Sequence, residues 1–100
     1  MREVVVTGYG IVSCLGNDID AVTESLKNSN SGITINEINK ELGLRSHISG
    51  SITDLNLKEK IDRKLYRFMG DAAAFAYLSA EEAIENANLS NEVLKDFRTG

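Results

Sequence analysis

The sequence of 100 residues contains no proline and no tryptophan, and only one cysteine and one histidine. The absence of proline excludes a proline-rich linker or a PxxP ligand. The single thiol of Cys14 cannot form an internal disulfide, and no cysteine–histidine cluster has the spacing of zinc ligands. Apolar residues make up 42% and charged residues 26% of the chain, which is typical of a globular domain and not of a disordered segment. The length suffices for one domain.

Basic residues are fewer than acidic ones: the chain has 11 lysines and arginines and 15 aspartates and glutamates, for a net charge of −4. An acidic chain is poorly suited to binding nucleic acid, whose affinity comes from neutralising phosphates. No apolar run approaches the roughly 20 residues of a membrane span, and the N-terminus lacks the apolar region of a signal peptide. We therefore expect a protein of the reducing cytoplasm that binds neither nucleic acid nor membrane.

The first half of the chain predicts one buried strand and one helix. Arg2–Thr7 carries three consecutive valines, a pattern typical of a strand buried on both faces in a parallel sheet. A glycine-rich loop over Gly8–Gly16 follows it. Asn17 or Asp18 is expected to cap a helix of about ten residues. An apolar stripe on that helix is formed by Ile19, Val22 and Leu26.

The middle of the chain gives weaker signals. Ile33 and Ile35 indicate a brief extended piece, and Glu37–Leu42 a single helical turn. Polar and apolar residues alternate over His47–Ile52, which predicts a half-buried strand. Asp54–Lys60 is polar and is predicted to be a loop.

A long helix is the strongest prediction, starting near Asp62 or Phe68 and ending at Ala87. Its small side chains form one stripe that would let another backbone approach closely, so we expect this helix to lie inside the protein. The stripe consists of Met69, Ala72, Ala73, Ala76, Ala80, Ala83 and Ala87. Ser90 is expected to cap a further short helix with an apolar face at Val93, Leu94 and Phe97.

The fold class that follows is α/β, but not a complete domain. A strand buried on both faces needs neighbours on each side, and a sheet normally has about four to six strands. Residues 1–100 supply one convincing strand and one weaker candidate. We therefore expect the opening piece of a larger α/β protein, or a chain covered by partner chains.

Three features could carry chemistry, and each has a simpler structural interpretation. The pair Gly8-x-Gly10 suggests dinucleotide binding, but position 13 is serine and no second strand follows at the right distance, so a tight turn that uses Gly10 and Gly16 is favoured. Cys14 could be a nucleophile, but the only histidine, His47, is 33 residues away, so a buried thiol is the default. Glu81 and Glu82 are expected on a solvated helix face.

A basic cluster over residues 58–67 stands out, with five basic and two acidic residues, or +3 in a chain of −4. If this segment is helical, Arg63, Lys64 and Arg67 share one face. Such a face would steer an acidic partner. The alternative is an ordinary solvated helix end with Asp62 and Asp71 as counter-charges, and the residues alone favour neither.

Several short motifs, taken together and in order, resemble the start of the 3-oxoacyl-[acyl-carrier-protein] synthases, the condensing enzymes of fatty-acid elongation. The motifs are Val5–Ser13, Ser31–Ile33, Arg45–His47, Ile61–Lys64 and Arg67–Met69. The third and fifth favour the synthase I branch over the synthase II branch. The similarity runs through essentially all 100 residues.

This resemblance implies a thiolase-like layered fold of two similar halves, with residues 1–100 as an incomplete N-terminal segment of the first half. It implies a decarboxylating condensation of an acyl thioester with malonyl-acyl carrier protein in a homodimeric enzyme without a cofactor or metal. The family's catalytic cysteine and two histidines lie beyond residue 100, so no catalytic residue is expected here. What carries over is the carrier-protein docking surface, expected at Lys64 and Arg67, with Arg63 a weaker candidate.

Overall fold

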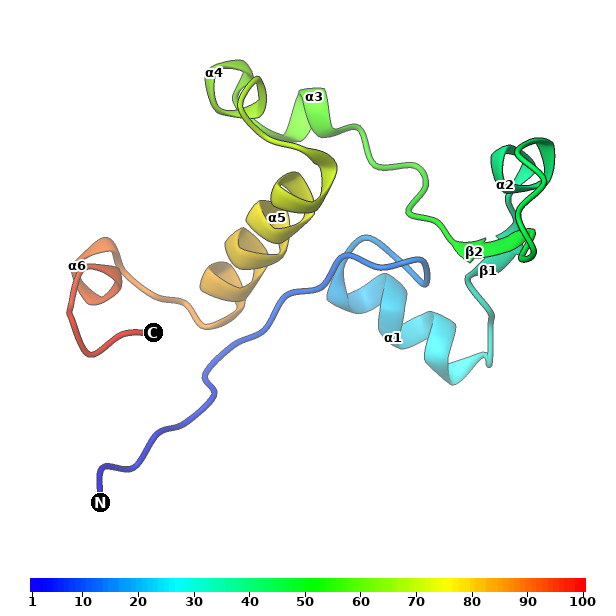
Figure 1. The fold of residues 1–100 in the computed structure, drawn as a ribbon. Helices are drawn as coiled ribbons and strands as arrows, with labels where there is room; N and C mark the ends of the chain where they lie inside the picture. The colour runs from blue at the N-terminus through cyan, green and yellow to red at the C-terminus, as the bar shows by residue number, and fades with distance from the viewer.

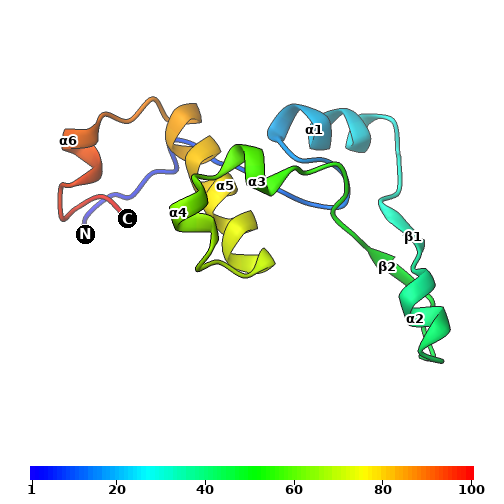
Figure 2. The same ribbon diagram turned by 90° about the horizontal axis from the view of Figure 1, so that it is seen from above.

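The computed structural model describes all of residues 1–100, as six helices and one two-stranded sheet (Figure 1). The helices are Ile19–Lys27 (α1), Glu37–Glu41 (α2), Leu57–Lys60 (α3), Arg63–Tyr66 (α4), Asp71–Asn86 (α5) and Asn91–Leu94 (α6). The strands Ile33–Ile35 (β1) and Ile48–Gly50 (β2) pair antiparallel, at two of the three places where extended structure was predicted. Figure 2 shows α3, α4 and α5 in the middle, α6 and both termini at one end, and the sheet with α2 at the other.

Side-chain caps fix where several helices begin. Asp18 Oδ1 accepts the N–H of Ala21 at 2.8 Å, and Ser90 Oγ accepts the N–H of Val93 at 3.4 Å. Both predicted caps are thereby confirmed. Asn36 caps α2 in the same way, which the sequence analysis did not anticipate.

The predicted long helix is confirmed as α5, whose start lies close to the predicted start near Phe68, whereas the alternative start near Asp62 is wrong. Residues 63–66 form α4, and α5 begins only at Asp71, after Gly70 in an extended conformation (φ −79°, ψ 170°). Glycine in a helix interior costs about 1 kcal/mol relative to alanine, so the chain breaks there. The predicted loop over Asp54–Lys60 is also wrong at its end, where Leu57–Lys60 forms α3 and the adjoining Ile61 is buried.

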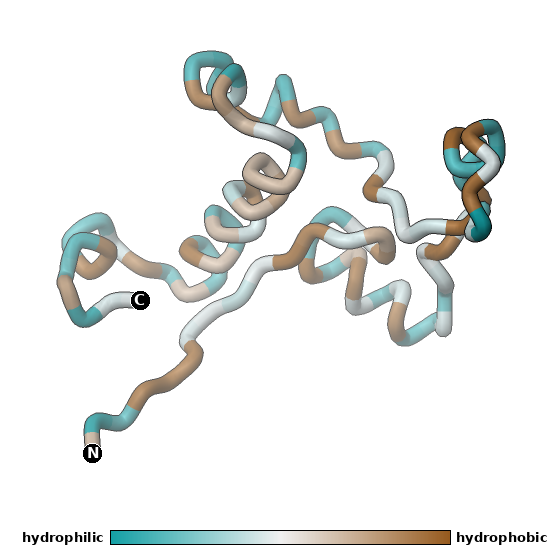
Figure 3. Tube along the Cα trace, viewed as in Figure 1, coloured by the Kyte–Doolittle hydropathy of each residue, from teal (hydrophilic) through white to brown (hydrophobic).

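The predicted strand over Arg2–Thr7 is wrong for residues 1–100 by themselves. Residues 1–8 form no backbone hydrogen bond, and Val4, Val5 and Val6 are 90%, 67% and 88% exposed. Figure 3 shows the apolar colouring of this arm near the N-terminus, and residues 4–8 line a hollow of about 450 Å³ together with residues from the end of α5 and from α6, without pairing as a strand. The physical reason is that no other segment of the 100 residues lies beside it to complete a ladder.

The alanine stripe of α5 is covered at only one end. Ala83 and Ala87 are half-buried against the loop that follows the valines, whereas four members of the stripe are exposed, namely Ala72, Ala73, Ala76 and Ala80. The fully buried alanine is Ala74, which is not in the predicted stripe. The predicted stripe is therefore in close contact only in the last two turns of α5, whereas near its start the helix buries another face, at Ala74.

The chain has little core of its own. Only Val22, Ile61 and Ala74 are buried, and they come from different elements. The accessible surface is 8337 Å², against about 5,600 Å² for a compact monomer of this mass. The radius of gyration is 16.9 Å, against about 13 Å for a compact domain of 100 residues. None of the helices combines the length and apolarity needed to cross a membrane.

We predict that the isolated chain of residues 1–100 is marginally stable, because burial this small cannot offset the conformational entropy of ordering the backbone. Heating followed by circular dichroism should give a broad transition, and a dye for exposed apolar surface should bind before heating. A single sharp calorimetric transition with equal calorimetric and van't Hoff enthalpies would contradict this expectation.

Candidate functional site

The loop after the valine arm packs its glycines directly onto α5. A Cβ added at Gly8 would lie 2.6 Å from the carbonyl oxygen of Ala83, and one added at Gly10 would overlap the carbonyl oxygen of Ser79. Only glycine permits so close an approach of two backbones. The predicted tight turn is therefore corrected to helix packing at Gly10, and it is confirmed at Gly16, which exchanges two backbone hydrogen bonds with Ser13. This packing leaves no room for a pyrophosphate on the α5 side of the loop.

The carboxylate of Glu82 joins three segments of the chain. Its Oε2 accepts the N–H of Ile11 at 2.8 Å, and its Oε1 accepts the N–H of Ile19, the first residue of α1, at 2.7 Å. A carboxylate at a helix N-terminus is stabilised by the unpaired N–H groups there. The prediction of a solvated face is therefore wrong for Glu82, whereas Glu81 is exposed as expected.

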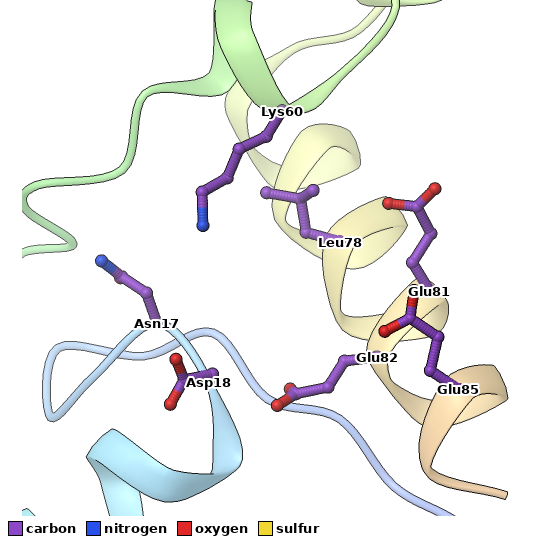
Figure 4. A pocket seen from close by; sticks show the side chains of 7 residues that line it. All are labelled: Asn17, Asp18, Lys60, Leu78, Glu81, Glu82 and Glu85. Atoms are coloured by element: carbon purple, nitrogen blue, oxygen red, sulfur yellow. The ribbon is translucent and has the colours of Figure 1, made fainter.

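Beside this contact lies a hollow of about 360 Å³, called here the acidic hollow (Figure 4). It is lined by Asn17, Asp18, Lys60, Leu78, Glu81, Glu82 and Glu85. In Figure 4, Lys60 extends from α3 toward the loop at Asn17, and Asp18 and Glu82 lie between that loop and α5. A hydrogen bond with Glu81 and its negative charge raise the pKa of the neighbouring Tyr77. This side of α5 is therefore electronegative.

Cys14 and His47 are not brought together as a catalytic pair. Cys14 is half-buried. A Cβ added at Gly32 would lie 2.7 Å from its Sγ, and one added at Gly50 would lie 2.9 Å from it. The His47 side chain is exposed, and neither side chain forms a hydrogen bond. The thiol packs between the loop and the sheet, in agreement with the structural interpretation of the sequence.

A second hollow, of about 420 Å³, lies at α3 and α4 and is called here the basic hollow. It is lined by Lys58, Arg63, Tyr66 and Arg67, while the exposed Lys64 lies on α4 outside it. The N–H of Arg67 donates to the carbonyl of Arg63 at 3.3 Å, so these two arginines lie one helical turn apart. The predicted common face is confirmed for Arg63 and Arg67, whereas Lys64 lies outside the hollow that these two line.

The cations of this surface have no carboxylate partner. The two ion pairs of the structure, Lys40–Glu37 and Arg98–Asp96, lie elsewhere, and Arg98 holds the pKa of Asp96 below its usual value through hydrogen bonds. The carboxylate of Asp62 accepts the backbone N–H of Lys64 at 2.8 Å and forms no ion pair. The alternative in which Asp62 and Asp71 pair with the basic residues is therefore not realised.

Lys58 is the member of this surface that sequence reasoning missed. Lys58 belongs to the basic cluster over residues 58–67, but the helical spacing that places Arg63, Lys64 and Arg67 on one face does not include it. It reaches the basic hollow because the chain turns between α3 and α4, where Ile61 is buried with an extended backbone (φ −119°, ψ 135°). An apolar residue inside a highly charged run is the signal that could have indicated this turn.

All of residues 1–100 match the family model described as the N-terminal domain of β-ketoacyl synthases, and the chain belongs to this family. It is 51% identical, over its full length, to 3-oxoacyl-[acyl-carrier-protein] synthase 1 of Haemophilus influenzae, of which it covers 24%. Over 96 residues it is 45% identical to the Escherichia coli K12 synthase 1, covering 96% of this chain and 23% of that protein. Over 93 residues it is 32% identical to the chloroplastic synthase I of Arabidopsis thaliana, covering 93% of this chain and 20% of that protein. The chain thus spans about a quarter of these curated relatives.

We predict that Glu82→Gln loosens the loop and the start of α1, because an amide supplies one acceptor where the carboxylate supplies two. In a chain of the relatives' full length, the loss should be about 1–3 kcal/mol of unfolding free energy, with faster hydrogen exchange at Ile11 and Ile19. Glu81→Gln, the adjacent and exposed carboxylate, is the matched control. Equal exchange in the two variants would contradict the assigned contact.

We predict that, in a chain of the relatives' full length, Gly10→Ala lowers the thermal midpoint strongly, because the added methyl overlaps the backbone of α5. Forcing a methyl into a filled contact costs about 1–3 kcal/mol. Gly70→Ala is the control, since a Cβ there meets no atom within 4 Å. If differential scanning calorimetry gives the same midpoint for both variants, the loop is not held on α5.

Proposed function

We propose that residues 1–100 form the N-terminal segment of a 3-oxoacyl-[acyl-carrier-protein] synthase of fatty-acid elongation. The observation that carries this proposal is the match of the entire chain to the start of curated synthases, at 51% identity to one of them. The reaction is the decarboxylating condensation of an enzyme-bound acyl group with malonyl-acyl carrier protein. It takes place in a cytoplasmic homodimer with the thiolase-like layered fold.

The segment contributes scaffold and docking surface, and it is inactive alone. Cys14 has no base beside it and packs against glycines, and no group of three or more metal-binding side chains is gathered. The free valine arm and the exposed alanines of α5 are apolar surfaces suited to pack within a layered sheet-and-helix domain. Chemistry therefore rests on residues outside this chain.

The docking role rests on charge. Lys64 and Arg67, with Arg63 beside them, lie exposed and unpaired on a chain whose net charge is −4. Exposed cations without internal partners are free to interact with an incoming anionic surface. An acyl carrier protein, which presents an acidic helix, is the partner of the proposed reaction.

We predict that the double variant Lys64→Glu/Arg67→Glu of the full-length synthase binds its carrier protein at least about 10-fold more weakly. Reversed charges repel an acidic partner, so the association rate should change more than the dissociation rate. Added salt should reduce the difference in affinity between the variant and the unmodified enzyme. Stopped-flow fluorescence with labelled carrier protein gives both rates, and alkylation of the catalytic thiol should proceed at the normal rate.

Lys27→Glu/Lys40→Glu is the matched control, because it changes the net charge equally on α1 and α2, away from the basic hollow. Weakening by both double variants to the same extent would show a general charge effect. Unchanged affinity of the Lys64→Glu/Arg67→Glu variant would reject the docking role.

A further inference from the structure

The two lysines of α3 line two different hollows, which carry opposite charge. Lys60 lines the acidic hollow, whose lining includes Asp18 and three glutamates of α5 (Figure 4). Lys58, two residues earlier on the same helix, lines the basic hollow with Arg63, Tyr66 and Arg67. The same type of side chain therefore lies in two opposite electrostatic environments.

The charge of Lys58 is left uncompensated. No carboxylate lines the basic hollow, and Lys58 forms no ion pair within the chain. Three cations around one hollow repel one another, and an anionic group entering it would relieve that repulsion. Lys60 also forms no ion pair, but the hollow that it lines contains four carboxylates, so an external anion would be repelled there.

Contacts within the chain restrict two of the groups around the basic hollow, Arg63 and Arg67. The Arg67 guanidinium lies 4.5 Å from the centroid of the Phe68 ring, a cation–π contact that limits its motion. The backbone hydrogen bond from Arg67 to Arg63 fixes their spacing, and the Asp62 cap fixes the start of α4. Tyr66 adds a hydroxyl that can donate to an oxygen anion.

We propose that Lys58, Arg63, Tyr66 and Arg67 form a socket that receives a carboxylate side chain of the acidic carrier protein. This inference rests on the proposed function and deepens it, because it adds Lys58 and Tyr66 to the docking surface. A guanidinium matches a carboxylate with two parallel hydrogen bonds, and a lysine ammonium adds a further charge-assisted contact. Charge complementarity selects an acidic protein surface as the occupant.

The test compares Lys58→Glu with Lys60→Glu in the full-length synthase, using carrier protein that lacks its phosphate-containing prosthetic arm. Both variants make the same charge change on α3, two residues apart. We expect Lys58→Glu to weaken binding at least about 5-fold, and Lys60→Glu by less than about 2-fold, with a shallower salt dependence for Lys58→Glu. Lys58→Gln should give a loss of affinity between those of the unmodified enzyme and Lys58→Glu. It replaces Lys58→Glu in the comparison if the glutamate variant fails to fold.

The outcomes separate the inference from the proposed function. Equal effects of Lys58→Glu and Lys60→Glu, with binding still lost in Lys64→Glu/Arg67→Glu, overturn the socket and leave the docking surface. Normal affinity in all three variants overturns both. An effect of Lys58→Glu that appears only when the carrier protein has its prosthetic arm overturns the carboxylate as occupant and identifies a phosphate instead.

Discussion

One carboxylate holds the arrangement of the N-terminal half. Glu82 on α5 accepts the backbone N–H groups of Ile11 and Ile19, and so fixes the glycine loop and the first turn of α1 at the same time. It can reach both because Gly10 brings the loop backbone into contact with the helix. In a chain with almost no buried apolar surface, such charge-assisted bonds to the backbone replace much of what a core would provide.

The surface of the chain is electrically divided, although its net charge is only −4. Acidic side chains of α5 line the acidic hollow, whereas Lys58 of α3 and the two arginines Arg63 and Arg67 line the basic hollow. A separation of this kind acts as a dipole that orients an approaching charged protein before contact. The net charge of −4 alone would have indicated a basic partner and not an acidic one.

Local signals in the sequence were sufficient for local structure. Asp18 and Ser90 were predicted as helix caps and are found as such, because capping depends on residues only three positions apart. The valine strand was wrong because a strand depends on a neighbour, which the 100 residues do not contain. The docking residues Arg63, Lys64 and Arg67 were predicted from helical spacing and from resemblance, and their role stays a prediction. Lys58 and Glu82 were missed because their positions depend on chain turns and long-range contacts that spacing cannot show.

The contact between Glu82 and Ile11 joins residues 71 positions apart. Closing so long a loop is slow compared with the formation of single helices. At about 5–20 residues per second of synthesis, the loop at Ile11 waits roughly 4–14 s after leaving the peptidyl-transferase centre before Glu82 is made. Throughout that interval the glycine loop has no α5 to pack against, so the N-terminal part of the growing chain cannot adopt the arrangement that Glu82 holds.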